Sequence, residues 1–222
     1  MMLNLFSIFD SQTFFFSLNW ISSMLIFLFL PQIYWMMNSR MIFLMLNFLS
    51  ILWNEFKIIL KFKFNLNNLI YLISLFIYIL MNNFMGLFPY IFTSSAHLMF
   101  SLTFSLSMWI GLMMFGWLKN TKFMFAHLVP QGTPFILMFF MVLIELLSNL
   151  IRPLTLAVRL TANMIAGHLL LTLLGMFTPN FLNFYLIILL CQLLLLILEI
   201  AVSLIQAYVF VILMTLYFKE TN

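Results

Sequence analysis

The sequence predicts an all-α integral membrane protein, and two observations lead to that class. Of the 222 residues, 66% are apolar and only 6% are charged, whereas soluble domains carry roughly 25% charged residues. Apolar stretches of about 20 residues, the length that crosses the hydrocarbon core of a bilayer, recur along the chain. We therefore expect a single membrane domain over 1–222, with about five membrane-embedded helices plus one interfacial amphipathic helix.

The first two expected elements differ in polarity. The run 14–37 is uncharged and long enough to span a bilayer, and Pro31 marks a kink in it or its end. The stretch 40–65 carries polar residues at spacings of three and four, which indicates an amphipathic helix lying in the interface. Its uncharged part is short for a span, although spanning is the alternative. The polar residues of this pattern are Asn47, Ser50, Asn54, Lys57 and Lys61.

Four further helices are expected, at 66–88, 98–118, 135–176 and 180–218. The last two would each be about 60 Å long, twice the ~30 Å thickness of the hydrocarbon. We therefore expect a strongly tilted hairpin with a large partner beside it.

Charge and cysteine content exclude several classes of partner. With five crossings, most basic residues fall on one side of the membrane, which predicts an outer N-terminus and an inner C-terminus. No basic run is interleaved with exposed aromatic residues, so nucleic acid is not an expected partner. The single cysteine, Cys191, excludes a disulfide framework, and three scattered histidines cannot hold two haems. No metal or cofactor is expected.

Ionisable and amide side chains form a polar stripe on each of the two long helices. An arginine inside the membrane costs on the order of 3 kcal/mol, so such stripes require protein partners or water-filled cavities. The polar residues of 135–176 are Glu145, Asn149, Arg152, Arg159, Asn163 and His168, and those of 180–218 are Gln192, Glu199, Ser203 and Gln206.

The spacing of these residues predicts two compartments on either side of Arg159. A hairpin turn between 177 and 182 would bring Glu199 and Gln206 close to Arg159. His168 lies about half a turn around the helix from Arg159, and Glu145 lies about 21 Å along it in the other direction.

This arrangement is typical of proton translocation. Arginine stays charged at physiological pH, so it cannot carry a proton itself and repels a hydronium ion. Glutamate and histidine can exchange protons near neutrality once burial shifts them. A continuous chain of such groups would leak, whereas two chains interrupted by a fixed cation would not.

Simpler interpretations stay open. Arg159 could be a structural charge satisfied by Glu199 or by carbonyls, and the chain could be a purely structural membrane subunit. Arg152 could satisfy carbonyls freed by Pro153, or pair with Glu145. Amide side chains inside a membrane are often helix-packing contacts rather than channel walls; here these are Asn149, Asn163 and Gln206. On sequence grounds alone, Glu220 is an ordinary terminal residue.

Four segments, in order and at suitable spacing, resemble the ATP synthase subunit a family. They are 83–90, 127–134, 150–168 and 199–210. Ala96, before His97, is a departure, because a hydroxyl residue is expected there.

The resemblance implies a stator subunit that conducts protons to a rotating ring of c subunits and makes no ATP on its own. It implies that Arg159 is the essential arginine facing the ring carboxylates. His168 and Glu199 would belong to the half-channel from the intermembrane space, and Glu145 and Glu220 to the matrix half-channel. Supporting polar residues would be Gln206 across the hairpin, Asn163 beside the path, and Arg152, Asn149 and Ser203.

The resemblance also implies the surroundings of the chain. It would lie in the mitochondrial inner membrane, with the N-terminus in the intermembrane space and the C-terminus in the matrix. Its partners would be the c-ring, peripheral-stalk and accessory subunits, and membrane lipid.

Overall fold

The regular secondary structure of the described part of the chain is entirely helical. The computed structural model describes residues 5–13, 16–31, 34, 36–37, 39–60, 66–129, 132, 134–178 and 185–221, and within these ranges no strand occurs. Five described helices are long and apolar enough to cross a membrane. The predicted all-α membrane fold is therefore confirmed. The five helices are α2 (Arg40–Ile59), α3 (Leu66–Gly86), α4 (Leu98–Lys119), α6 (Phe135–Phe177) and α7 (Tyr185–Thr221).

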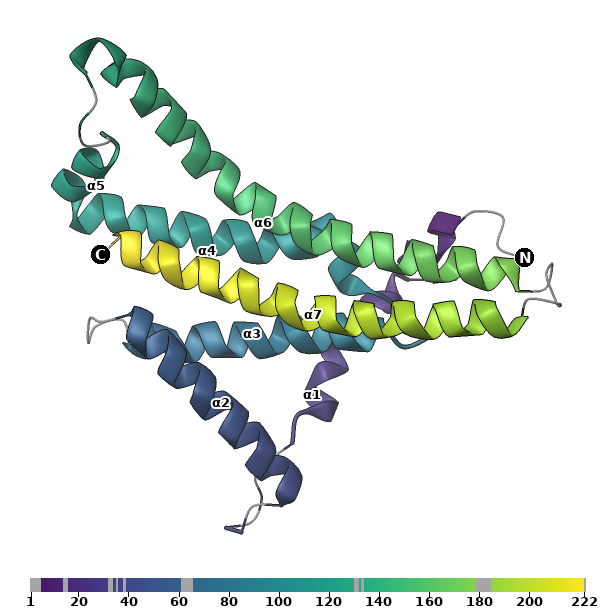
Figure 1. Cartoon of the computed structure of the whole chain (residues 1–222). Coiled ribbons are helices and arrows are strands. Elements are labelled where there is room, and N and C mark those ends of the chain that lie inside the picture. Colours follow the sequence, from purple (N-terminus) through teal and green to yellow (C-terminus); the bar gives the residue numbers. More distant parts are fainter. Residues whose placement is uncertain are drawn as a thin grey trace.

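The helices α3, α4 and α7 run side by side with the second half of α6, while α2 and the first half of α6 diverge to opposite sides (Figure 1). The largest cluster of buried apolar side chains lies where α2, α3, α6 and α7 meet. Phe56 of α2, Leu72 of α3, Leu160 of α6 and Val211 of α7 are almost fully buried there. This cluster holds the hairpin of α6 and α7 against the rest of the bundle.

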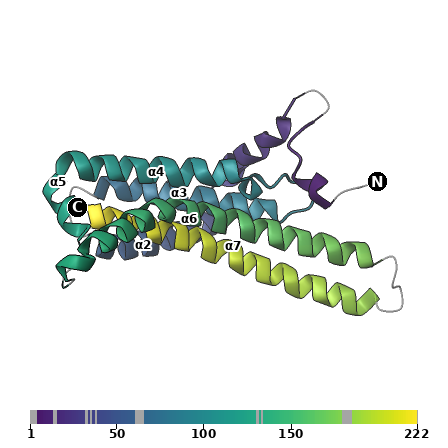
Figure 2. The ribbon, with the colours of Figure 1, turned by 90° about the horizontal axis from the view of Figure 1, so that it is seen from above.

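The hairpin is longer than any single crossing requires. Helix α6 has 43 residues and α7 has 37, which correspond to about 65 and 56 Å. Its tip projects beyond α3 and α4 in two perpendicular views (Figures 1 and 2). Pro153 lies within α6, where a missing backbone hydrogen bond favours a bend, and α6 changes direction along its length in Figure 1.

The expectation of a single helix at 14–37 is wrong. The described residues of this range form a 3-10 helix, Leu18–Met24, and a short α-helix α1, Ile26–Phe29. The described residues from Leu30 to Met37 are not helical. Leu30 is extended, with ψ of 123°, because a residue before proline is disfavoured in the helical conformation. The hydroxyl of Ser22 donates to the carbonyl of Phe92, so this segment is tied to a distant loop.

Helix α2 is amphipathic, as its sequence pattern predicts. Asn47, Ser50, Asn54 and Lys57 are exposed, while the opposite face buries Phe56 against α3 and α7. The structure contains no membrane, and the length of α2 permits a crossing, so its interfacial position remains a prediction. Lys61 and the end of the expected range at 65 lie outside the described residues.

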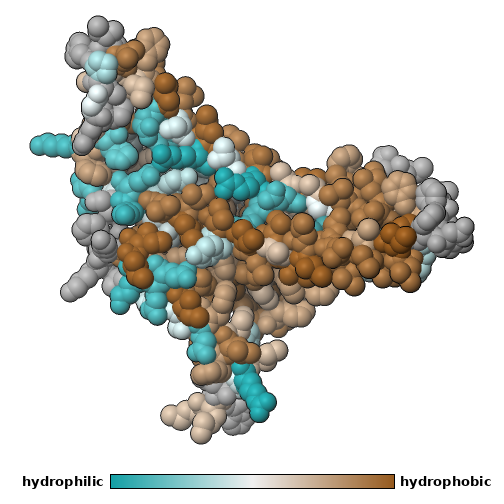
Figure 3. Space-filling view, viewed as in Figure 1, coloured by the Kyte–Doolittle hydropathy of each residue, from teal (hydrophilic) through white to brown (hydrophobic). Residues whose placement is uncertain are grey.

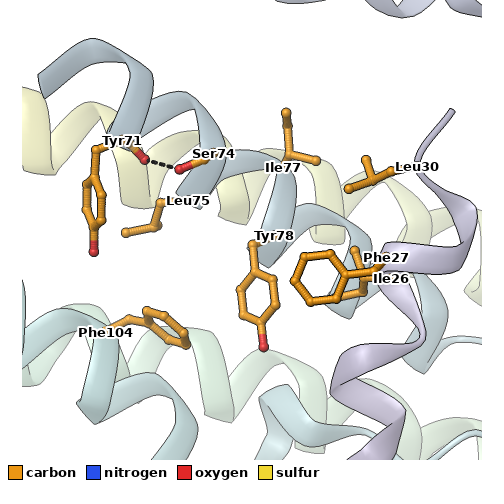
Figure 4. A pocket seen from close by; sticks show the side chains of 9 residues that line it. All are labelled: Ile26, Phe27, Leu30, Tyr71, Ser74, Leu75, Ile77, Tyr78 and Phe104. Carbon is orange, nitrogen blue, oxygen red and sulfur yellow. Dashed lines mark hydrogen bonds between the residues drawn. The ribbon is translucent and has the colours of Figure 1, made fainter. Parts of the chain in front are cut away.

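Much of the visible surface is apolar, as expected for contact with lipid or with partner helices. Hydrophilic residues gather at the end that holds α5 (Thr121–His127) and the C-terminus, and continue between α6 and α7, whereas the described parts of α6 and α7 towards the other end of the hairpin are hydrophobic (Figure 3). An apolar pocket of about 360 Å³ lies between α1, α3 and α4. The side chains of Phe27, Tyr78 and Phe104 surround it (Figure 4).

Replacing Phe56 with alanine should destabilise the bundle, because the side chain is 0% exposed and fills the junction of four helices. We expect a loss of about 3 kcal/mol from the cavity left behind. The matched control is Phe43→Ala on the same helix, where the ring is 57% exposed and the change should be small. Thermal unfolding of the purified complex in detergent measures both. Equal losses for the two variants would contradict the observed core.

Candidate functional site

Three side-chain contacts set the register of the α6–α7 hairpin. Arg152 donates a hydrogen bond to Glu220, Asn163 donates one to Gln206, and the Glu199 side chain packs against the backbone of Gly167. Interpolation places Arg159 opposite about position 210 of α7. The expectation that Glu199 lies beside Arg159 is therefore wrong, because the carboxyl group of Glu199 lies against Gly167 instead. Glu199 thus lies opposite Gly167, which is eight positions after Arg159 on α6 and about 12 Å from it along the helix axis.

The first polar group lies where the C-terminal end of α7 contacts the middle of α6. The Arg152 guanidinium lies 2.6 Å from the Glu220 carboxylate and 3.7 Å from that of Glu145. The Tyr217 ring lies beneath the same guanidinium, 5.4 Å from its centre. The structure thus brings Glu145 and Glu220 together on one cation, although they are separated in the sequence. Asn149 and Glu220 also line an adjoining pocket of about 200 Å³.

The middle of the hairpin carries an unpaired cation. The Asn163 amide donates to the Gln206 carbonyl oxygen over 2.9 Å, which links the two helices. Arg159 is exposed on α6, and among the described residues it forms no hydrogen bond and no ion pair. Because an exposed guanidinium in a hydrocarbon layer is costly, this side chain requires a partner from outside the chain or water.

The third group is buried and centres on Glu199. This residue is 7% exposed, and neither carboxyl oxygen has a hydrogen-bond partner within the described part of the chain. A β-carbon placed on Gly167 would lie 2.6 Å from Oε1 of Glu199, so the missing side chain makes room for the carboxyl group. A buried carboxyl group without partners costs stability, which is typical of a functional residue rather than a structural one.

His168, which follows Gly167 directly, connects this group to an open cavity. Its ring packs against Phe9 at a centroid distance of 6.3 Å. The cavity has a volume of about 950 Å³, and His168 and Thr172 of α6 form one wall of it. Asp10 and Asn19 of the N-terminal segment lie on another wall. His168 and Glu199 are therefore close to a polar compartment that Arg159 does not line.

Some residues of the site carry no clear signal in the sequence. Gly167 lies within the segment 150–168, and its role is visible only in that a glycine inside a long helix is costly and points to a close approach. Asn82 and Asn83 are buried on α3, with side-chain nitrogens that lack partners among the described residues. Ser203 is buried too, but the hydrogen bond of its hydroxyl goes to the carbonyl of Ile200 in its own helix, and none within the described residues links it to the other site residues.

Fold and site together define a multi-pass helical membrane protein whose longest helices carry ionisable groups at separate depths. The family model described as ATP synthase A chain matches residues 15–219. ATP synthase subunit a of Drosophila melanogaster is 55% identical, and the match covers 100% of both chains. The same subunit of Locusta migratoria is 57% identical over 99% of both chains, and that of Aedes aegypti is 52% identical over 100% of both. The chain therefore belongs to the ATP synthase A chain family.

Two glycine-to-alanine variants should shift stability in opposite directions. Gly167→Ala forces the Glu199 carboxyl group to move, whereas a β-carbon on Gly111 of α4 meets nothing within 4 Å. We expect Gly111→Ala to stabilise by up to about 1 kcal/mol through helix propensity, and Gly167→Ala to destabilise. Thermal unfolding of the assembled complex compares them. A stabilised Gly167→Ala variant would contradict the close approach of Glu199.

Proposed function

We propose that this chain is the proton-conducting stator subunit of a mitochondrial ATP synthase membrane sector, working through two offset half-channels separated by Arg159. Membership of the ATP synthase A chain family supports the role in proton conduction. The observation that carries the finer mechanism is the unpaired Arg159, which lies along the hairpin between two separate groups of proton-exchanging side chains.

The route from the intermembrane space starts in the 950 Å³ cavity. A proton passes by way of His168 to Glu199 and then to a carboxylate of the c-ring. This order is supported by the cavity wall that His168 forms and by the contact between Glu199 and the residue preceding it. Once neutral, the rotor carboxyl group can rotate into lipid, which an ionised carboxylate could do only at high cost.

The route to the matrix runs through the opposite end of the hairpin. A rotor site that has completed nearly a full turn releases its proton toward Glu145 and Glu220. Their shared contact with Arg152 favours a positioning role for that arginine, because a guanidinium holds two carboxylates but exchanges no proton.

Arg159 separates the two routes. Its side chain is exposed on α6, which suits an encounter with a carboxylate on the rotor. A fixed cation favours the ionised form of a neighbouring carboxylic acid, so it promotes proton release as each rotor site arrives. The Asn163–Gln206 bridge, four residues further along α6, fixes the two helices at this point.

The surroundings follow from the same proposal. The chain lies in the mitochondrial inner membrane, with its N-terminus in the intermembrane space and its C-terminus in the matrix. The c-ring covers the exposed side of the overlong hairpin, and peripheral-stalk and accessory subunits contact other surfaces.

Arg159→Ala should abolish ATP synthesis driven by a proton gradient, with a loss of about 100-fold or more, because the fixed charge opposite the rotor is gone. The assembled complex should persist, since no hydrogen bond or ion pair within the described part of the chain is lost. Lys57→Ala on the exposed face of α2 is the control and should retain activity. The measurement is ATP formed per assembled complex in sealed vesicles. A normal rate in the Arg159 variant would end the proposal.

Glu199→Gln should slow proton flux per assembled complex by about 100-fold, because an amide has nearly the same shape but cannot exchange protons. Thr215→Val is the control: that hydroxyl is buried on α7 but bonds only within its helix, so flux should stay normal. If the Glu199 variant lowered complex abundance and left flux per complex unchanged, the alternative of a structural membrane subunit would be favoured.

A further inference from the structure

The short helix α5, which the mechanism above does not use, brings a histidine into the matrix-side pocket. Helix α5 follows α4 after Asn120, and His127 is its last residue. The 200 Å³ pocket is walled by His127, Asn149 and Glu220, together with aromatic and methionine side chains such as Trp109, Trp117 and Met124. Four helices, α4, α5, α6 and α7, therefore meet around one small space.

Helix α5 is held firmly in this position. Gly116 of α4 leaves room for the Met124 side chain, whose sulfur would lie 3.1 Å from a β-carbon at that glycine. The rings of Trp117 and Phe125 contact edge to face at 4.8 Å. Phe123, one turn before His127, packs against the imidazole ring at 6.2 Å. These contacts pack α5 against α4, and His127, although it is exposed, forms part of the pocket wall.

The chemistry of the wall distinguishes His127 from its neighbours. Of the side chains that line this pocket, only His127 and Glu220 titrate, and Glu220 is already bound to Arg152. Histidine is the side chain whose charge changes most readily near neutral pH. Other charged groups on the surrounding helices do not line the pocket: Lys119 of α4, Lys122 of α5, Glu145 and Arg152 of α6, and Lys219 of α7.

We propose that His127 is a further proton-path residue, which takes protons from the Glu220 group and passes them to matrix water. The proposal rests on the function proposed above. In the transfer, the carboxyl oxygen of Glu220 gives its proton to a ring nitrogen of His127, and the imidazolium then gives one to water. Both side chains return to their starting state, so one proton reaches the matrix water for each passage.

The test is proton flux in the complete ATP synthase complex reconstituted into vesicles, with the variant His127→Gln. We expect flux per complex to fall by about tenfold. This loss is smaller than the ~100-fold minimum that a general acid–base group typically contributes. The reason is that water reaches the open pocket and replaces part of the function of the imidazole. Free imidazole added on the matrix side should restore most of the loss. Lys122→Gln, on the same helix but not lining the pocket, should conduct normally and show no imidazole effect.

Two outcomes would overturn the proposal: unchanged flux in His127→Gln, or a loss that imidazole does not restore and that Lys122→Gln shares. The same vesicles with Glu199→Gln separate this proposal from the one on which it rests. If Glu199→Gln blocks flux and His127→Gln does not, only the role of His127 fails. If Glu199→Gln conducts normally, the proton path itself fails.

Discussion

An ionised side chain within hydrocarbon needs an opposite charge, water or a partner protein, and this constraint organises α6 and α7. Arg152 meets it within the chain, through two carboxylates and an aromatic ring. Arg159, seven residues further along the same helix, does not meet it among the described residues. The same residue type on one helix thus has two roles, one satisfied internally and the other open to an external partner.

The register of the hairpin turns this difference into two separate compartments. Glu145 and Glu220 converge on Arg152 at one end, while His168 and Glu199 lie near a polar cavity toward the other. Between these two compartments, a hydrogen bond joins the side chains of Asn163 and Gln206, two amide groups that do not titrate. Because neither amide can accept and release a proton as Glu or His does, this bridge suits a barrier better than a conducting chain.

Much of this arrangement was accessible from the sequence, because helical periodicity is a local property. The stripes on the long helices follow from spacing alone, and α6, at Phe135–Phe177, lies close to the range expected from apolar patterning. The helix expected at 14–37 ends before Pro31, because a residue before proline is disfavoured in the helical conformation, and hydropathy alone does not register this. Hydropathy also cannot register the hydrogen bond from Ser22 to the distant carbonyl of Phe92.

Contacts between distant segments were beyond prediction for a related reason. The stripes do not determine which residues of the two long helices face one another, so the sequence predicts Glu199 closer to Arg159 than its observed contact with Gly167 allows. No spacing rule pairs Glu55 of α2 with the Tyr208 hydroxyl of α7, which donates to it over 3.1 Å. The pairing of Arg152 with Glu220 could not be predicted either, since Glu220 lies 68 positions away from it in the sequence.

The central claim is that opposite aqueous phases reach the two ends of the hairpin and do not meet at Arg159. Single cysteines test it directly, after the exposed Cys191 is replaced by serine. Thr172→Cys in the cavity wall should react with a membrane-impermeant thiol reagent only from the intermembrane-space side, and Asn149→Cys only from the matrix side. Labelling of either position from both sides, or of both positions from the same side, would contradict the account.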